Sequence, residues 1–225
     1  MKHLKRILVT GTVLLLIGLT STAQKNKLPV REWSLSSEKP LVFYISGDGG
    51  FTDFSSSLCN LINKSGYSIT FFNSYTYFWN KKTPAQTAND IAAYVEKQCS
   101  KRKNQQFILI GYSFGAEIAP FVINNLPDTV KKKLVSTVLL SPSSSTDFEV
   151  HVWDMMGGKK KRSMDVVAEI NKMGQQKTTT IFGNKENDFP VSQVKLKNYK
   201  NENLPGGHRF EGNTDEVVKT MVKYF

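Results

Sequence analysis

The sequence predicts an α/β fold, namely a reduced, doubly wound, mostly parallel sheet with helices on both faces. Short apolar, β-prone runs alternate along the chain with segments whose apolar residues recur at helical spacing. The runs are continuously apolar, which is typical of strands buried on both faces, and helical crossovers between such strands produce a parallel sheet. With 225 residues, 40% of them hydrophobic, the chain suits one globular domain.

The expected elements follow one another along the chain. Residues 24–38 are polar and form a lead-in or an edge strand, and strands are expected at 41–45, 68–73, 107–110, 134–140 and 178–182. Helices are expected at 53–65, 83–100, 114–126, 164–173 and 215–224. Asp53 is a suitable N-cap for the first helix and Gly66 a suitable stop, while Pro84 suits the first turn of the second helix.

The N-terminal segment has the three-part layout of a secretory signal peptide. Residues 1–6 are basic, residues 7–19 are almost entirely apolar, and the small residues Ser21 and Ala23 precede the expected cleavage point. We therefore expect a signal peptide ending at Ala23, a single domain over 24–225, and a periplasmic or secreted protein. An uncleaved anchor helix is the alternative. The formal charge of +11 favours contact with an anionic surface.

A serine between two glycines carries the predicted chemistry. Gly111, Ser113 and Gly115 form a G-x-S-x-G motif after a predicted strand and before a predicted helix, which is the context of the nucleophile elbow in the α/β-hydrolase fold. Small neighbours allow the sharp turn that lifts the hydroxyl above the sheet. The backbone N–H of Phe114 then points at the developing oxyanion. A glycine-tolerant turn in a non-catalytic relative is the alternative.

A serine nucleophile needs a base and an acid that orients the base. His208 lies late in the chain, where the order nucleophile, acid, histidine expects it, whereas His151 is better interpreted as a surface or structural histidine. The acid is expected after the strand at 178–182, where both Glu186 and Asp188 are suitable. The spacing slightly favours Glu186.

The loop after the first core strand is expected to supply the second oxyanion donor. Its sequence is SGDGGF, and glycines allow the backbone to approach a ligand closely. The donor is the N–H of Asp48 or Gly49. The loop lacks the GK[ST] of a P-loop and the G-x-G-x-x-G pattern, so a nucleotide-binding role is disfavoured. The two cysteines and the histidines after residue 23 are in no ligand spacing, so we expect no metal. We also expect no cofactor and no nucleic-acid partner.

Several longer blocks resemble the VirJ/AcvB family of bacterial virulence proteins. They are SGDGGF, SYTYFW, TPAQTANDIAAYV, LIGYSFGAEIAPF, DFEV and LPGGHRF, and they extend from about residue 40 to the C-terminus. The resemblance implies an exported α/β-hydrolase-like protein that hydrolyses aminoacylated phosphatidylglycerol, chiefly the lysyl form. It places Ser113 and His208 at the nucleophile and base positions. Arg209 stands where a second histidine is expected, which leaves the head-group preference open.

Two further features fit a lipid ester. Tyr77 and Trp79 follow a strand at its carboxyl end and, with Phe51, are candidate substrate contacts that hold a cationic head group by cation–π attraction; core or lid packing is the alternative. The basic run at 159–162 suits a peripheral contact with an anionic membrane, or is simply a solvated charge run.

The family also has members linked to type IV secretion. A non-catalytic accessory protein that contacts secretion-system proteins is therefore the alternative function. The two cysteines, Cys59 and Cys99, lie on successive crossovers, which usually cover opposite faces of such a sheet, so we expect two free, buried thiols. The sequence leaves the oligomeric state open.

Overall fold

A computed structural model describes residues 28–35, 38–151 and 162–225. Within these residues the main sheet has seven strands in the order β1-β3-β2-β4-β5-β8-β9. All neighbouring pairs are parallel except β1 and β3, which run antiparallel. A second, two-stranded sheet pairs β6 with β7. The predicted doubly wound, mostly parallel sheet is confirmed.

The elements are short and closely spaced. The strands are β1 (Val30–Trp33), β2 (Leu41–Ile45), β3 (Ile69–Phe72), β4 (Phe107–Tyr112), β5 (Leu134–Leu140), β6 (Ser145–Thr146), β7 (Met164–Asp165), β8 (Thr178–Gly183) and β9 (Tyr199–Leu204). The helices are α1 (Asp53–Lys64), α2 (Ser74–Tyr77), α3 (Pro84–Cys99), α4 (Phe114–Asn125), α5 (Asp128–Lys131), α6 (Val166–Asn171) and α7 (Thr214–Val222).

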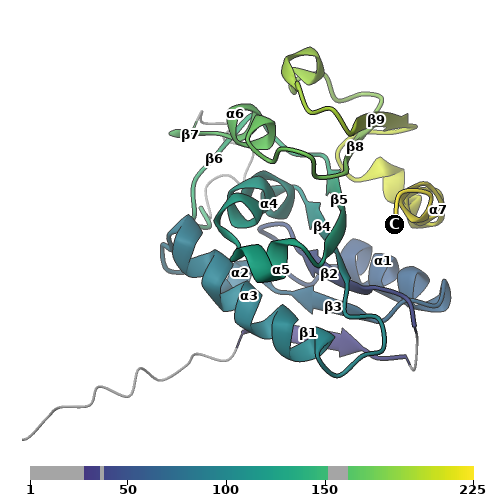
Figure 1. The fold of residues 1–225 in the computed structure, drawn as a ribbon. Helices are drawn as coiled ribbons and strands as arrows, with labels where there is room; N and C mark the ends of the chain where they lie inside the picture. Colours follow the sequence, from purple (N-terminus) through teal and green to yellow (C-terminus); the bar gives the residue numbers. More distant parts are fainter. Residues whose placement is uncertain (1–27, 36–37, 152–161) are drawn as a thin grey trace, which may run out of the picture.

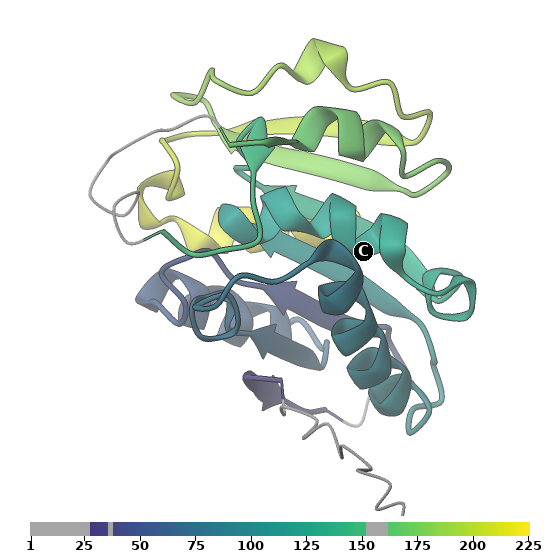
Figure 2. The ribbon, with the colours of Figure 1, turned by 90° about the vertical axis from the view of Figure 1, so that its left-hand side faces the viewer.

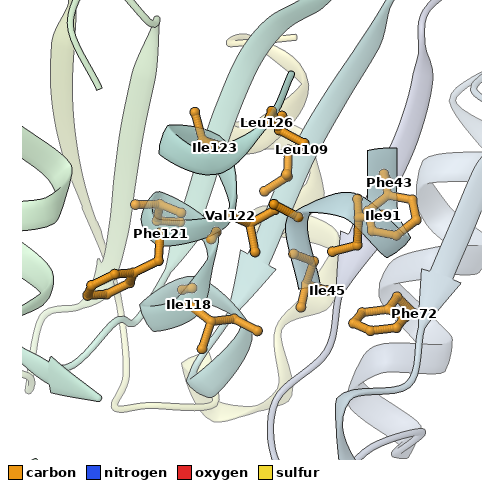
Figure 3. Packing of buried hydrophobic residues seen from close by; sticks show 14 of the residues in the cluster. Phe43, Ile45, Phe72, Ile91, Leu109, Ile118, Phe121, Val122, Ile123 and Leu126 are labelled. Carbon is orange, nitrogen blue, oxygen red and sulfur yellow. The ribbon is translucent and has the colours of Figure 1, made fainter. Parts of the chain in front are cut away.

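Helices cover both faces of the sheet, as Figures 1 and 2 show. Helices α3, α4 and α6 pack on one face, where Phe43, Ile45 and Leu109 meet Ile91 of α3 and the apolar side of α4 (Figure 3). Helices α1 and α7 pack on the other face. Every residue of β2, β3 and β4 is buried, because alternate side chains enter the two cores. Each large apolar side chain buried in this way contributes about 1.5–3 kcal/mol.

Several local features differ from the prediction. Strand β9 was missed because its sequence, YKNENL, is polar, and it pairs only with β8 at the edge of the sheet. The segment expected to be a helix from Met164 instead begins as β7, and α6 starts at Val166 behind the N-cap Asp165. Thr52 rather than Asp53 caps α1, since its hydroxyl accepts a hydrogen bond from the Ser55 N–H.

The two cysteines are free and buried, as expected. Cys59 lies in the core beneath α1 and Cys99 in the core beneath α3, so the sheet separates them. No helix in the described ranges is long and apolar enough to cross a membrane. Residues 1–27, and with them the predicted signal peptide, lie outside the described residues.

Candidate active site

Ser113 occupies a sharp turn between β4 and α4. Its φ of 52° and ψ of −122° are rare for a residue with a side chain. The packing around the turn explains both flanking glycines. A Cβ on Gly115 would lie 2.2 Å from the carbonyl oxygen of Ile45, and one on Gly111 would lie 2.5 Å from the carbonyl oxygen of Gly115. The G-x-S-x-G motif therefore folds as the predicted elbow.

His208 lies between the serine and a carboxylate. Its Nε2 is 2.8 Å from the Ser113 Oγ, and its Nδ1 is 2.9 Å from the Glu186 Oε2. In the tautomer that satisfies both contacts, the serine hydroxyl donates to Nε2 and the Nδ1–H donates to the carboxylate. The structure thus brings together the three residues that the sequence singled out as nucleophile, base and favoured acid.

Glu186 is held by hydrogen bonds on both of its oxygens. Its Oε1 accepts from the Ser141 hydroxyl at 2.7 Å and from the Gly183 N–H at 2.8 Å, which leaves Oε2 for His208. Burial alone raises the pKa of Glu186, but the hydrogen bonds from His208, Ser141 and Gly183 outweigh burial and hold the pKa below 4.5. Asp188, the other candidate acid, is exposed and lies on the wall of the adjacent cavity.

The loop that carries His208 is fixed from two sides. The Tyr112 hydroxyl donates to the His208 carbonyl oxygen at 3.2 Å, and the two rings lie 5.5 Å apart. Burial raises the pKa of Tyr112 to about 12, so this hydroxyl keeps its proton. The loop also packs against the end of β8, where a Cβ on Gly183 would lie 2.3 Å from the Gly207 carbonyl oxygen. This close approach brings the base beside the acid.

The β2–α1 loop approaches the nucleophile closely. A Cβ built on Gly47 would lie 3.4 Å from the Cβ of Ser113. Gly47 is therefore the residue of this loop that packs against the serine. Asp48 lines the cavity next to Ser113 and Phe114, whereas Gly49 is exposed and is not part of the cavity wall. Of the two predicted donors, Asp48 is the better placed. The Phe114 N–H opens α4, where backbone donors have no helical acceptor.

The aromatic residues predicted as substrate contacts do not line this cavity. Phe51 stacks against Trp33 and meets the edge of Phe71 at the far side of the sheet. The prediction misjudged Phe51 because its neighbours in space come from β1 and β3 rather than from the glycine loop.

Tyr77 and Trp79 also lie elsewhere. The Tyr77 ring packs in the core, and its hydroxyl donates to Asp90 at 2.6 Å, so α2 and α3 use it as a structural link. Trp79 is 55% exposed and stacks edgewise on Tyr75. The sequence did not reveal α2, the short helix that ends at Tyr77, and neither ring belongs to the cavity wall.

The cavity beside Ser113 has a volume of about 620 Å³, and its wall is part polar and part apolar. Much of the wall is the segment 141–149 after β5, a serine-rich stretch that the sequence analysis passed over. The aromatic rings that do reach the cavity are Phe114, Phe182 and Phe189. His151 also lies on the wall, but its Nε2 contacts Asp147 at 2.8 Å, in keeping with its predicted structural role.

Acidic side chains predominate on the described wall. Six carboxylates face one arginine and one lysine. The carboxylates are Asp48, Glu117, Asp147, Glu149, Glu186 and Asp188, and the basic residues are Arg162 and Lys185. Across the three described ranges, no three His, Cys, Asp or Glu side chains gather closely enough to hold a metal ion.

Comparison with known proteins agrees with this geometry. The family described as bacterial virulence protein (VirJ) matches residues 39–225. The chain belongs to this family. The match spans the whole sheet except β1, together with the elbow and the His208 loop of this VirJ-family chain. No curated protein matches it.

Solved structures show the fold of this VirJ-family chain. A lipase-esterase related protein from Clostridium acetobutylicum superposes with a TM-score of 0.65 at 12% identity, over 88% of this chain and 100% of its own. Est1E from Butyrivibrio proteoclasticus gives 0.60 at 18% identity, over 86% and 92%. A thioesterase domain from the curacin biosynthetic pathway gives 0.58 at 13% identity, over 86% and 94%. The predicted α/β-hydrolase fold is therefore confirmed.

Proposed function

We propose that this protein is a serine hydrolase that cleaves a carboxylic ester. The observation that carries the proposal is the hydrogen-bonded chain from Ser113 through His208 to Glu186 at the wall of an open cavity. A protein that used the fold only for binding would need neither the strained backbone of Ser113 nor the hydrogen bonds of His208 to Ser113 and Glu186.

The geometry supplies each step of acyl transfer. The Ser113 Oγ attacks the ester carbonyl while His208 takes its proton, and the resulting oxyanion accepts hydrogen bonds from the Phe114 N–H and the Asp48 N–H. His208 then returns the proton to the leaving alcohol as the ester bond breaks. Water, deprotonated by His208, attacks the acyl-enzyme and releases the acid. Glu186 orients the imidazole and stabilises its protonated form throughout.

For the substrate, we propose the aminoacyl ester of phosphatidylglycerol, of the lysyl type. Membership of the family and the wall of the cavity both support this choice. A wall with an excess of carboxylates suits an acyl group that carries an ammonium and disfavours a fatty acyl chain. Arg209 is exposed and follows the base directly in the chain. It stands where the family pattern has a second histidine, so it is the residue that leaves the head-group preference open.

We further propose that the enzyme acts at a membrane, outside the cytoplasm. The signal-peptide layout supports export, and the run at 159–162 supports peripheral contact with an anionic bilayer. Lys159, Lys160 and Lys161 lie outside the described residues. Arg162 lies at the cavity wall, where its guanidinium is 3.7 Å from the Asp147 carboxylate.

Labelling with a fluorophosphonate probe tests the proposed chemistry. The wild type is expected to be labelled at Ser113, and the Ser113→Ala variant to remain unlabelled. Hydrolysis of a soluble ester is expected to fall by at least about a thousandfold in Ser113→Ala and in His208→Ala, because the members of a triad act as a unit. Absence of labelling and of turnover in the folded wild type would instead favour a binding module that contacts secretion-system proteins.

A further inference from the structure

Glu117 lies in the first turn of α4, four residues after the nucleophile. Its N–H donates to the Ser113 carbonyl oxygen at 3.0 Å, and its side chain lines the cavity together with Ser113 and Phe114. Side chains of a helix lean toward its N-terminus, which in α4 is the end that follows the nucleophile. The carboxylate therefore lines the same cavity at the end of α4 where the serine lies.

Among the described residues, the groups that contact the Glu117 carboxylate are hydrogen-bond donors without charge. Its Oε1 accepts from the Ser143 N–H at 3.3 Å, and the hydroxyls of Ser143 and Thr146 also donate to the carboxylate. No ion pair joins it to a lysine, arginine or histidine of the described chain. The charge that acts on its pKa is another carboxylate, that of Asp48, which raises it.

Two other partly or fully enclosed carboxylates have cationic partners. Asp147 contacts His151 and Arg162, and Glu169 contacts Lys172 at 2.8 Å. Burying a carboxylate without such a partner is unfavourable, and burial does raise the pKa of Glu117. A first-turn acid also interacts favourably with the helix dipole, but an exposed side chain would serve that purpose equally well. The cavity position and the missing counter-ion thus require a further explanation.

We propose that the Glu117 carboxylate binds the α-ammonium group of the substrate's acyl part. The inference rests on the proposed ester hydrolysis and adds the group that selects the acyl chain. When the acyl carbon is bonded to the Ser113 Oγ, an α-ammonium stands two bonds away, within reach of a side chain one turn along α4. The ammonium then supplies a positive charge that no described residue places beside Glu117, and Asp48 adds to the attraction.

A matched pair of esters with the same alcohol measures this selection. L-Alanyl and isobutyryl glycerol have the same shape and differ by an ammonium in place of a methyl group. The wild type is expected to have a kcat/KM at least about tenfold higher for the alanyl ester, because a hydrogen bond to a charged group discriminates by roughly this factor or more. The ratio is expected to fall at least about tenfold in Glu117→Gln. It should stay within about twofold of the wild-type ratio in Glu96→Gln, which removes an exposed carboxylate of α3 outside the cavity.

The outcomes separate the subsite from the activity. Equal loss of both esters in Glu117→Gln, or no preference in the wild type, overturns the ammonium subsite and leaves the hydrolase proposal standing. If the wild type hydrolyses neither ester, the hydrolase proposal fails, and the subsite is tested by thermal shift with L-alaninamide and isobutyramide. The subsite then predicts stabilisation by alaninamide that is lost in Glu117→Gln. Stabilisation by neither amide, or by both equally, contradicts it.

Discussion

The two oxygens of Glu186 have different partners, and this division orients the base. Oε1 accepts two hydrogen bonds from the scaffold, while Oε2 faces the imidazole of His208. The carboxylate cannot rotate without losing the contacts from Ser141 and Gly183. Asp188 comes from the same loop but is exposed, so its shorter side chain does not take this place.

Replacing each candidate acid by its amide tests this assignment. Glu186→Gln is expected to reduce kcat by about two to four orders of magnitude, because an amide neither stabilises the imidazolium nor fixes the tautomer. Asp188→Asn is expected to stay within about threefold of the wild type. Both are measured on a soluble ester at one pH. A larger loss in Asp188→Asn would reverse the assignment.

Glu117 should affect stability in a pH-dependent way. Burial raises its pKa, hydrogen bonds from Ser143 and Thr146 lower it in part, and Asp48 raises it, with a net rise above 4.5. An acid whose pKa is higher in the folded state contributes its full stability below 4.5 and loses that contribution as the pH rises through the folded-state pKa. The melting temperature of Glu117→Gln, relative to wild type, should therefore be higher at pH 7.5 than at pH 4, by about two degrees or more.

A difference in melting temperature that is the same at both pH values would show that Glu117 does not titrate anomalously in the folded state.

At the scale of elements, the site depends on the close packing of the start of α4 against the carboxyl end of β2. Gly115→Ala would place a methyl group 2.2 Å from the Ile45 carbonyl oxygen, so strand and helix must separate. We expect a loss of about 2–3 kcal/mol in the free energy of unfolding, measured by urea denaturation. Gly207→Ala is the control, because no atom lies within 4 Å of a Cβ built there. Similar stabilities for the two variants would contradict this account of the motif.

The elements also show how far the sequence could predict the fold. The buried parallel strands were recognisable because a strand that enters two cores is apolar throughout, as in β2 and β4. The edge strand β9 has no such requirement and could not be distinguished from a loop. The elbow and His208 were found because their chemistry requires a fixed order along the chain. Glu117 and the wall segment 141–149 were missed, because their role depends only on where the folded chain places them.

At the scale of the whole molecule, charges are divided between the two ends of the sheet. Acidic residues surround the cavity at the carboxyl ends of the parallel strands. Exposed lysines precede the opposite ends of several strands, namely Lys39 before β2, Lys132 before β5, Lys177 before β8 and Lys197 before β9. Backbone hydrogen bonds from Phe107 to Lys133 and from Thr137 to Lys177 show that these segments lie side by side. Much of the positive charge thus lies away from the proposed active site.

This division makes the orientation at a membrane testable with two triple variants of equal charge. If the cavity faces the bilayer, Lys159, Lys160 and Lys161 act near the lipid, where each basic residue contributes about 1 kcal/mol. Their change to Gln should lower turnover of an aminoacyl lipid in phosphatidylglycerol vesicles at least about tenfold, relative to turnover of a soluble ester. The same change at Lys131, Lys132 and Lys133, at the opposite end, should lower it by less than about threefold.

Added salt should reduce the difference between the variants, since the attraction decays over about 8 Å at physiological ionic strength. Equal losses in both variants would mean that the bilayer attracts the protein without orienting it, and a larger loss in the second would place the membrane at the end opposite the cavity.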